Sequence, residues 1–190
     1  MNVGQPSLAA ALQSAELIHD RAAIDAAIAR MGAQITHALA GERALFLTVL
    51  HGGLIFAGPL ALAIDCDLEF DYVHATRYRG NTQGAELHWL RKPQAQMRDR
   101  TVLLADDILD EGHTLAALRD ACLAAGARRV LIAALCEKRH DRRAPGIVAD
   151  FVGVSVPDRY VFGYGMDYHE QGRNLPGIYA LSVEEENRVA

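Results

Sequence analysis

Apolar positions along the chain follow two kinds of spacing, and the first is helical. Between residues 14 and 40 the large apolar side chains recur three or four positions apart, which predicts an amphipathic helix ended by Gly41. The side chains that set this spacing are Ile24, Ile28, Met31, Ile35 and Leu39.

The second pattern consists of continuous apolar runs of strand length. Such runs occupy residues 44–50, 102–105, 128–138, 150–156 and 178–182, and helical stretches follow the first two, with one of them over residues 114–125. Strands without polar alternation, separated by helices, indicate a parallel sheet covered on both faces. Residues 69–78 and 87–93 are predicted to be hairpin arms around a polar tract, residues 79–86, that is either disordered or a mobile loop with a function. The expected fold class is α/β with a parallel, doubly wound sheet.

Composition narrows the class of protein. The chain has 190 residues, of which 51% are apolar, so one domain with a sizeable core is expected. Its 19 basic and 24 acidic residues give a net charge of −5, which argues against a nucleic-acid-binding protein. The cysteines Cys66, Cys122 and Cys136 show no CxxC spacing and are expected to be reduced thiols. With no signal-peptide pattern and no membrane-spanning run, a soluble cytoplasmic protein is expected.

The stretch VLLADDILDEGHTL, residues 102–115, carries the strongest chemical pattern. Asp106 and Asp107 directly follow an apolar run, so they are expected at the carboxyl edge of the sheet, where α/β proteins bind ligands. The loop 110–114 opens a helix and offers backbone N–H groups to a phosphate, while the carboxylates suit ribose hydroxyls or Mg²⁺. The alternative is that Asp110 and Glu111 only cap the helix, which leaves the Asp106–Asp107 pair unexplained.

This stretch resembles the phosphoribosyl pyrophosphate (PRPP) motif of the type I phosphoribosyltransferases. VLHGG (49–53) resembles their pyrophosphate loop, and ATRYRGNTQG (75–84) resembles their flexible catalytic loop. CEKR (136–139) and VPDRYVFGYGMDYHEQGRNLP (156–176) resemble the purine-recognition segments of the hypoxanthine-guanine phosphoribosyltransferases. The resemblance spans residues 18–181. It implies one phosphoribosyltransferase domain over residues 1–190, with a core over 42–155 and a hood formed by residues 1–20 and 156–190.

The activity implied by the resemblance is purine salvage, in which N9 of hypoxanthine or guanine displaces pyrophosphate from C1 of PRPP. Asp110 would be the general base at the purine N7. Asp106 and Asp107 would hold the ribose hydroxyls and, with Asp167, Mg²⁺. The residues implied at the ribose 5-phosphate are those of the loop: Asp110, Glu111, Gly112, His113 and Thr114.

Other roles follow from the same resemblance, each beside a simpler alternative. Pyrophosphate would be bound by His51, Gly52 and Arg173, and the flexible loop would act through Arg77 and Tyr78. The purine would be bound by Lys138, Tyr160, Val161 and Asp167. Alternatively, Lys138 reaches solvent, Arg173 pairs with a neighbouring acid, and Tyr160 is a half-buried aromatic at a strand end. His51 could face solvent and the loop could be an ordinary hairpin tip.

Three positions depart from the usual family pattern. Glu111 stands where many relatives have Thr or Ser, and we expect its side chain to point away from the phosphate. Asp106 replaces the more usual Glu, and His51 the frequent Lys. Two other functions remain open: a xanthine-preferring enzyme, and a nucleotide-sensing regulator on the same fold. Relatives form dimers or tetramers, so a homodimer or homotetramer is expected, without nucleic-acid or membrane partners.

Overall fold

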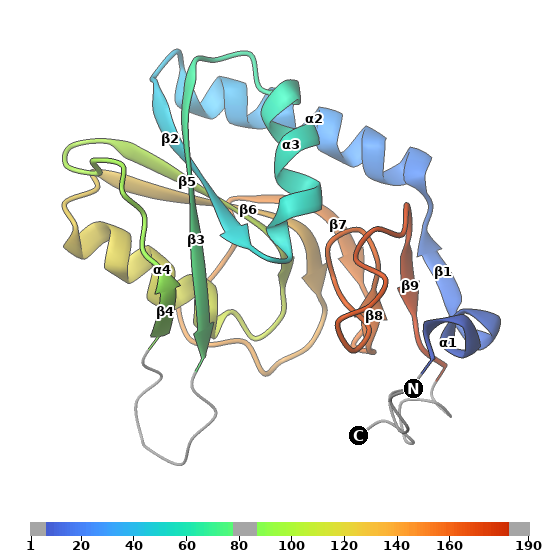
Figure 1. Ribbon diagram of the computed structural model, residues 1–190. Coiled ribbons are helices and arrows are strands. Elements are labelled where there is room, and N and C mark those ends of the chain that lie inside the picture. The colour runs from blue at the N-terminus through green and yellow to red at the C-terminus, as the bar shows by residue number, and fades with distance from the viewer. Residues whose placement is uncertain (1–6, 78–86, 183–190) are drawn as a thin grey trace.

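A mostly parallel sheet of six strands organises the larger part of the chain (Figure 1). The computed structural model describes residues 7–77 and 87–182. The strand order across the sheet is β4 (Leu87–Arg91), β3 (Leu68–Arg77), β2 (Ala44–Leu50), β5 (Thr101–Leu109), β6 (Arg129–Lys138) and β7 (Phe151–Val156). Only β4 runs antiparallel to its neighbour. The predicted α/β class with a parallel sheet is confirmed.

Helices cover both faces of this sheet. In Figure 1, α2 (Arg21–Leu39) and α3 (Gly53–Ala63) lie on one face and α4 (His113–Ala124) on the other. Alternate side chains of the central strands enter separate cores, with Phe46 and Leu103 packing towards α2 and α3, and Leu47 and Leu104 towards α4. Burial of each of these four side chains stabilises the fold by about 1.5–3 kcal/mol. No helix in the described residues is long and apolar enough to cross a membrane.

A second, antiparallel sheet lies beside the first and uses both ends of the described chain. Its strands are β1 (Glu16–His19), β9 (Ile178–Ala180) and β8 (Val161–Phe162), in that order, with α1 (Leu8–Ser14) next to them (Figure 1). Phe162, Tyr168 and Leu181 form a small core of their own. These segments belong to the predicted hood, but its limits stay a prediction.

The predicted helix over residues 14–40 is wrong at its beginning. Residues 16–19 form β1, which pairs with β9 from the opposite end of the chain, and helix α2 starts only at Arg21. Asp20 caps it, since its side chain accepts a hydrogen bond from Ala23 N at 2.8 Å. The apolar spacing that suggested the helix is confined to α2, where Ile24, Ile28, Met31, Ile35 and Leu39 are all buried.

The predicted end of the central strand also needs correction. β5 does not stop at Ala105 but continues to Leu109, so Asp106 and Asp107 lie within the strand. The extension is held by β6, whose Ala134 pairs with Asp106 and whose Cys136 pairs with Ile108. The strand therefore ends at Leu109, and Asp110 is the first residue after it.

The sheet topology determines where a ligand can bind. β2 lies between β3 and β5, and all three strands are parallel. The chain leaves β2 through α3 on one face and leaves β5 through α4 on the other (Figure 1). This arrangement predicts a crevice at the carboxyl ends of the two strands. The segments that flank this crevice are His51–Gly53 after β2 and Asp110–Gly112 after β5.

Asp71 stabilises the segment that leaves β4. Its carboxylate, on a side chain 8% exposed, pairs with Arg91 Nη1 at 2.8 Å and accepts hydrogen bonds from Gln94 N at 2.6 Å and Ala95 N at 2.9 Å. Burial acts to raise the pKa of Asp71, but the Ala95 N–H, Arg91 and two further backbone N–H groups lower it to about 2. The folded protein therefore stabilises the ionised form of Asp71.

We expect Asp71→Ala to lower the free energy of unfolding at pH 7 by about 3 kcal/mol, because the paired groups lose a charged acceptor. Since the folded pKa of about 2 lies below the usual value of 3.8, this contribution is present above about pH 4 and is lost as the pH falls towards 2. Urea unfolding at several pH values measures it. Asp67→Ala, which removes a 75% exposed acid, is the control and should cost under about 1 kcal/mol. An Asp71 variant no less stable than this control would contradict the assignment.

Candidate active site

Two adjoining cavities open at the carboxyl edge of the sheet. The first, about 370 Å³, is lined by Asp106, by the loop from Asp110 to Gly112 and by the start of α4. The second, about 300 Å³, is lined by Lys138, Tyr160, Val161, Met166 and Asp167. Both also have Asp107, Ile108 and Asp110 in their walls. Asp110 therefore stands between a loop-lined cavity and an aromatic-lined cavity.

The N-terminus of α4 has features that suit the binding of an anion. Gly112, the residue before the helix, has φ +80°, and a Cβ there would lie 2.7 Å from Ile147 Cγ2, so both the backbone and the space require glycine. No side chain caps the helix start, and residues 113 and 114 line the larger cavity. Uncapped N–H groups at a helix start favour a negatively charged group such as a phosphate.

Glu111 lies beside this helix start. Its side chain is 46% exposed, and a carboxylate oxygen lies 3.6 Å from His113 Nε2. The residue also contributes to the wall of the larger cavity. The negative charge of Glu111 is thus close to the helix start, and the expectation that it points away from a bound phosphate stays a prediction.

Asp106 and Asp107 place two acids side by side in the crevice. Asp107 is 8% exposed, and its backbone N–H donates to Asp106 Oδ1 at 3.0 Å. Burial raises the pKa of both carboxyls, and the charge of Asp107 raises that of Asp106 further. A cation would relieve this cost. Mg²⁺ is usually bound by one or two carboxylates together with substrate oxygens and water, and this pair of acids fits that requirement.

Asp110 is held by two side chains from β6 and the loop that follows. β5 and β6 pair in register up to Leu109 and Glu137, so the next residues, Asp110 and Lys138, lie side by side. Lys138 Nζ donates to Asp110 Oδ2 at 2.7 Å, and His140 Nε2 lies 2.6 Å from Asp110 Oδ1. Burial acts to raise the pKa of Asp110, but Lys138 and His140 outweigh it and lower the pKa. Asp110 is therefore an ionised carboxylate, able to accept a proton.

Lys138 does not extend into solvent, since its side chain is 13% exposed and ion-paired. His140, with a side chain 2% exposed, was not among the residues predicted from the sequence. Its distance from Asp110 depends on the path of the loop between β6 and β7, for which the apolar pattern carries no information.

The aromatic cavity contains the residues predicted to recognise a base. Tyr160 is partly buried, burial raises its pKa, and its hydroxyl donates to Asp167 O at 3.2 Å. Arg173 Nη2 pairs with Asp167 Oδ1 at 2.7 Å, and Arg173 Nη1 donates to Gly165 O at 2.8 Å. In this structure, which contains no ligand, Arg173 therefore pairs with a neighbouring acid, as the alternative interpretation of the sequence expected.

The loop after β2 packs closely against the acids. The Leu50–His51 peptide is cis, and the exposed His51 ring lies 4.2 Å from the His74 ring, centroid to centroid. A Cβ on Gly52 would lie 2.0 Å from Asp107 Oδ2, and one on Gly165 would lie 2.3 Å from Gly52 O. A side chain at either position would therefore displace its neighbour, and Gly165 also has φ +110°, which favours glycine.

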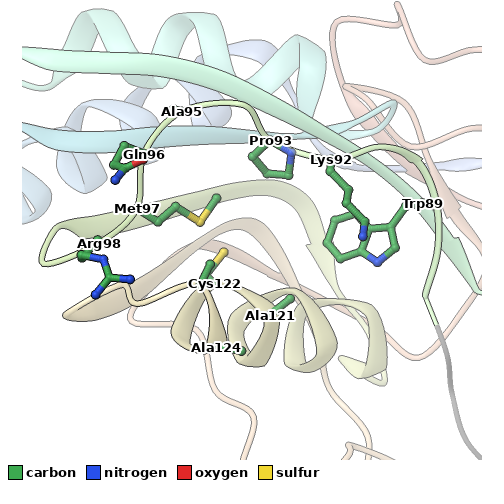
Figure 2. Close-up of a pocket in the computed structure, with 11 residues that line it drawn as sticks. Trp89, Lys92, Pro93, Ala95, Gln96, Met97, Arg98, Ala121, Cys122 and Ala124 are labelled. Atoms are coloured by element: carbon green, nitrogen blue, oxygen red, sulfur yellow. The ribbon is translucent and has the colours of Figure 1, made fainter.

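The predicted flexible loop follows β3. Arg77 is the last residue of β3, and Tyr78 lies outside the described residues. A third cavity, about 560 Å³, lies elsewhere, between residues 89–98 and α4 (Figure 2). Trp89, Met97 and Cys122 form much of its wall, and it contains none of the predicted site residues. Its lining offers no acids to match those of the crevice, so chemistry is assigned to the smaller pair of cavities.

Comparisons with known proteins agree with the site. Residues 14–171 match the phosphoribosyl transferase domain family. The hypoxanthine-guanine phosphoribosyltransferase of Streptococcus pneumoniae R6 is 35% identical over 167 residues, which cover 87% of this chain and 91% of that protein. That of Streptococcus mutans is 36% identical over 155 residues, 81% of this chain and 86% of that protein.

Solved structures agree as well. The hypoxanthine phosphoribosyltransferase of Staphylococcus aureus matches with a TM-score of 0.86 and 29% identity, over 96% of this chain and 98% of that one. A hypoxanthine-guanine phosphoribosyltransferase of Bacillus anthracis matches with a TM-score of 0.81 and 26% identity, over 89% and 99%. The chain therefore belongs to the phosphoribosyl transferase family and, within it, to the hypoxanthine-guanine phosphoribosyltransferases.

Proposed function

We propose that this chain transfers the 5-phosphoribosyl group of PRPP to N9 of hypoxanthine or guanine, giving IMP or GMP and pyrophosphate. The observation that carries the proposal is the position of Asp110, which belongs to the walls of both cavities. One cavity has the acids and helix start that suit a ribose phosphate, and the other has the lysine and tyrosine that suit a base. The curated relatives support the same reaction, and the regulator and the xanthine-preferring enzyme are not favoured.

In this proposal PRPP occupies the cavity of about 370 Å³ that is lined by the loop 110–114. Its 5-phosphate is bound by the loop 110–114, and its ribose hydroxyls by Asp106 and Asp107. Pyrophosphate lies at His51 and Gly52, where Arg173 reaches it by exchanging its contact with Asp167. Asp106, Asp107 and Asp167 are the acids that would hold Mg²⁺, which supplies positive charge against the pyrophosphate. The acids beside the ribose also stabilise the positive charge that develops at C1.

The base occupies the smaller cavity, stacked on Tyr160, with the Val161 carbonyl accepting from its edge. As N9 attacks C1, the bond from C1 to pyrophosphate breaks, and the carboxylate of Asp110 takes the proton of N7. Lys138 donates to the purine O6. Adenine carries an amino group there, so the Lys138 ammonium would face a second donor.

A substrate panel tests the proposal. Purified protein with PRPP and Mg²⁺ is given hypoxanthine, guanine, xanthine or adenine, and nucleotide formation is followed. Turnover of hypoxanthine and guanine, with adenine poorer by at least about 10³-fold, is expected. Preference for xanthine would keep the mechanism and correct the substrate, and inactivity with all four bases would contradict the proposal.

Removing the charge of Glu111 should improve the binding of PRPP. Because its charge lies near the helix start at the phosphate loop, Glu111→Gln should lower the KM for PRPP by about fivefold, equivalent to about 1 kcal/mol of relieved repulsion. The KM for hypoxanthine should stay unchanged. Asp120→Asn, which neutralises a 68% exposed acid on the same helix, is the control. A higher KM for PRPP in the Gln variant would mean that Glu111 supports the loop instead of opposing the phosphate.

Two further parts of the proposal concern the state of the protein. We place the enzyme in the cytoplasm, a reducing compartment that suits the free cysteines Cys66, Cys122 and Cys136. We also propose a homodimer or homotetramer, because Leu54 and Leu62 of α3 and Phe70 and Tyr72 of β3 are exposed apolar side chains. Sedimentation measures the oligomeric state directly.

A further inference from the structure

We propose that His140 is a positioning residue for the general base. It holds one oxygen of Asp110 throughout the reaction, while Lys138 exchanges its contact with the other oxygen for the purine. The inference rests on the proposed function, in which Asp110 accepts the N7 proton. His140 lines neither cavity, so it acts on the reaction only through Asp110.

The tautomer of His140 follows from its second contact. The backbone N–H of Arg142 donates to His140 Nδ1 at 3.1 Å, so Nδ1 presents a lone pair. The ring proton therefore lies on Nε2, which donates to Asp110 Oδ1 at 2.6 Å. Loss of the Nε2 proton, or addition of a proton at Nδ1, would break one of the two hydrogen bonds. The ring is thus fixed in one tautomer with its donor directed at the carboxylate.

The loop that carries His140 is anchored at several points, so the donor is held rigidly. Arg142 makes two contacts with Asp158, both at 2.7 Å. Arg143 pairs with Glu137 at 2.6 Å and donates to Lys138 O at 3.0 Å. Ala144 N donates to Glu111 O at 2.8 Å, which ties this loop to the phosphate loop. A positioning group needs such support, because a misplacement of about 1 Å can cost about 10²-fold in rate.

The two oxygens of Asp110 have different surroundings. Oδ1 is held by His140, whose side chain is 2% exposed and cannot move without disturbing the anchored loop. Oδ2 is held by Lys138, whose side chain lines the base cavity and has the length to turn towards it. When Lys138 moves to the purine O6, Oδ2 becomes available to N7 and Oδ1 stays fixed. Without His140, the carboxylate could rotate at that moment.

A comparison of two His140 variants tests the proposal. His140→Gln keeps an N–H donor close to the position of Nε2, whereas His140→Phe keeps the ring and removes the donor. The Phe variant should lower kcat by about 10–100-fold with little change in the KM for PRPP, and the Gln variant should recover most of that loss. His37→Phe, at an exposed histidine of α2, is the matched control and should leave kcat unchanged.

The pH profile adds a readout that packing alone would not change. The pKa of Asp110 is lowered by Lys138 and by His140, and Arg142, Asp158 and Glu111 are the other charged groups nearby. Losing the His140 donor should move the acidic limb of kcat/KM to higher pH in the Phe variant and leave it in place in the Gln variant. Equal losses in both variants with an unmoved limb, or kcat within twofold of wild type in both, would overturn the proposal.

A spectroscopic measurement separates this inference from the proposed function. In ¹⁵N NMR of imidazole-labelled wild-type protein, His140 should appear as the Nε2–H tautomer, with a downfield proton that moves upfield in Asp110→Asn, because a neutral amide is a weaker acceptor than a carboxylate. An Nδ1–H tautomer would overturn the inference even in an active enzyme. Absence of turnover by wild-type protein would overturn the proposed function, whatever the spectrum shows.

Discussion

Asp110→Asn should lower kcat/KM for hypoxanthine by about 10²–10⁴-fold, the usual contribution of a general base. The amide keeps the size of the side chain but cannot take the N7 proton, and it faces the donors Lys138 Nζ and His140 Nε2 with one oxygen instead of two. Because the N–H groups of the phosphate loop are unchanged, the KM for PRPP should move by less than about threefold. Initial rates at saturating PRPP and Mg²⁺ measure the effect.

Unfolding curves must accompany this variant, because removing one charge leaves that of Lys138 unpaired at a site 13% exposed. Asp120→Asn is the control for removing an acid from the same part of the chain. A folded Asn variant with at least a third of wild-type kcat would contradict the assignment of Asp110 as general base.

Gly52→Ala should reduce kcat/KM by at least about 10²-fold although it adds one methyl group. The backbone at Gly52 has φ −56° and ψ −48°, which alanine adopts freely, so the effect comes from space. The new Cβ would lie 2.0 Å from Asp107 Oδ2. Asp107 is 8% exposed, with Gly165 packed behind its Cβ, so the carboxylate must shift away from the ribose position.

The matched control is Gly58→Ala in α3, where a Cβ would meet nothing within 4 Å. This change should leave activity unchanged and stabilise the helix by about 0.5–1 kcal/mol. Gly52→Ala should instead cost about 1–3 kcal/mol through overpacking, measured by urea unfolding. Wild-type activity in Gly52→Ala would mean that the position of Asp107 is not critical for the reaction.

The fold could be predicted where one segment carries its own pattern. Runs such as residues 44–50 and 128–138 are largely buried strands because both faces of the sheet are covered, and no polar alternation interrupts their centres. The beginning of α2 could not be predicted, because residues 16–19 become a strand only by pairing with residues 178–180. This pairing between opposite ends of the chain leaves no local pattern in residues 16–19, although residues 178–180 lie in a predicted apolar run.

The residues of the candidate site likewise include some that the sequence predicts and some that it does not. Order along the chain, together with parallel pairing, was enough to expect Asp106, Asp107 and Asp110 at one edge of the sheet. The position of Lys138 beside Asp110 follows from the register between β5 and β6. His140 could not be predicted, since its contact depends on the conformation of a loop held by Arg142 and Arg143. The ion pair between Arg173 and Asp167 likewise depends on the conformation of the segment between them, and not on a pattern in the sequence.

In the proposed function, one active site transfers the phosphoribosyl group to a 6-oxopurine. The most direct measurement is the product balance of purified wild-type protein given PRPP, hypoxanthine and Mg²⁺, with nucleotide and pyrophosphate both quantified. We expect IMP and pyrophosphate in a 1:1 ratio, with formation dependent on both substrates. Binding of PRPP without IMP, or release of pyrophosphate without IMP, would contradict the account.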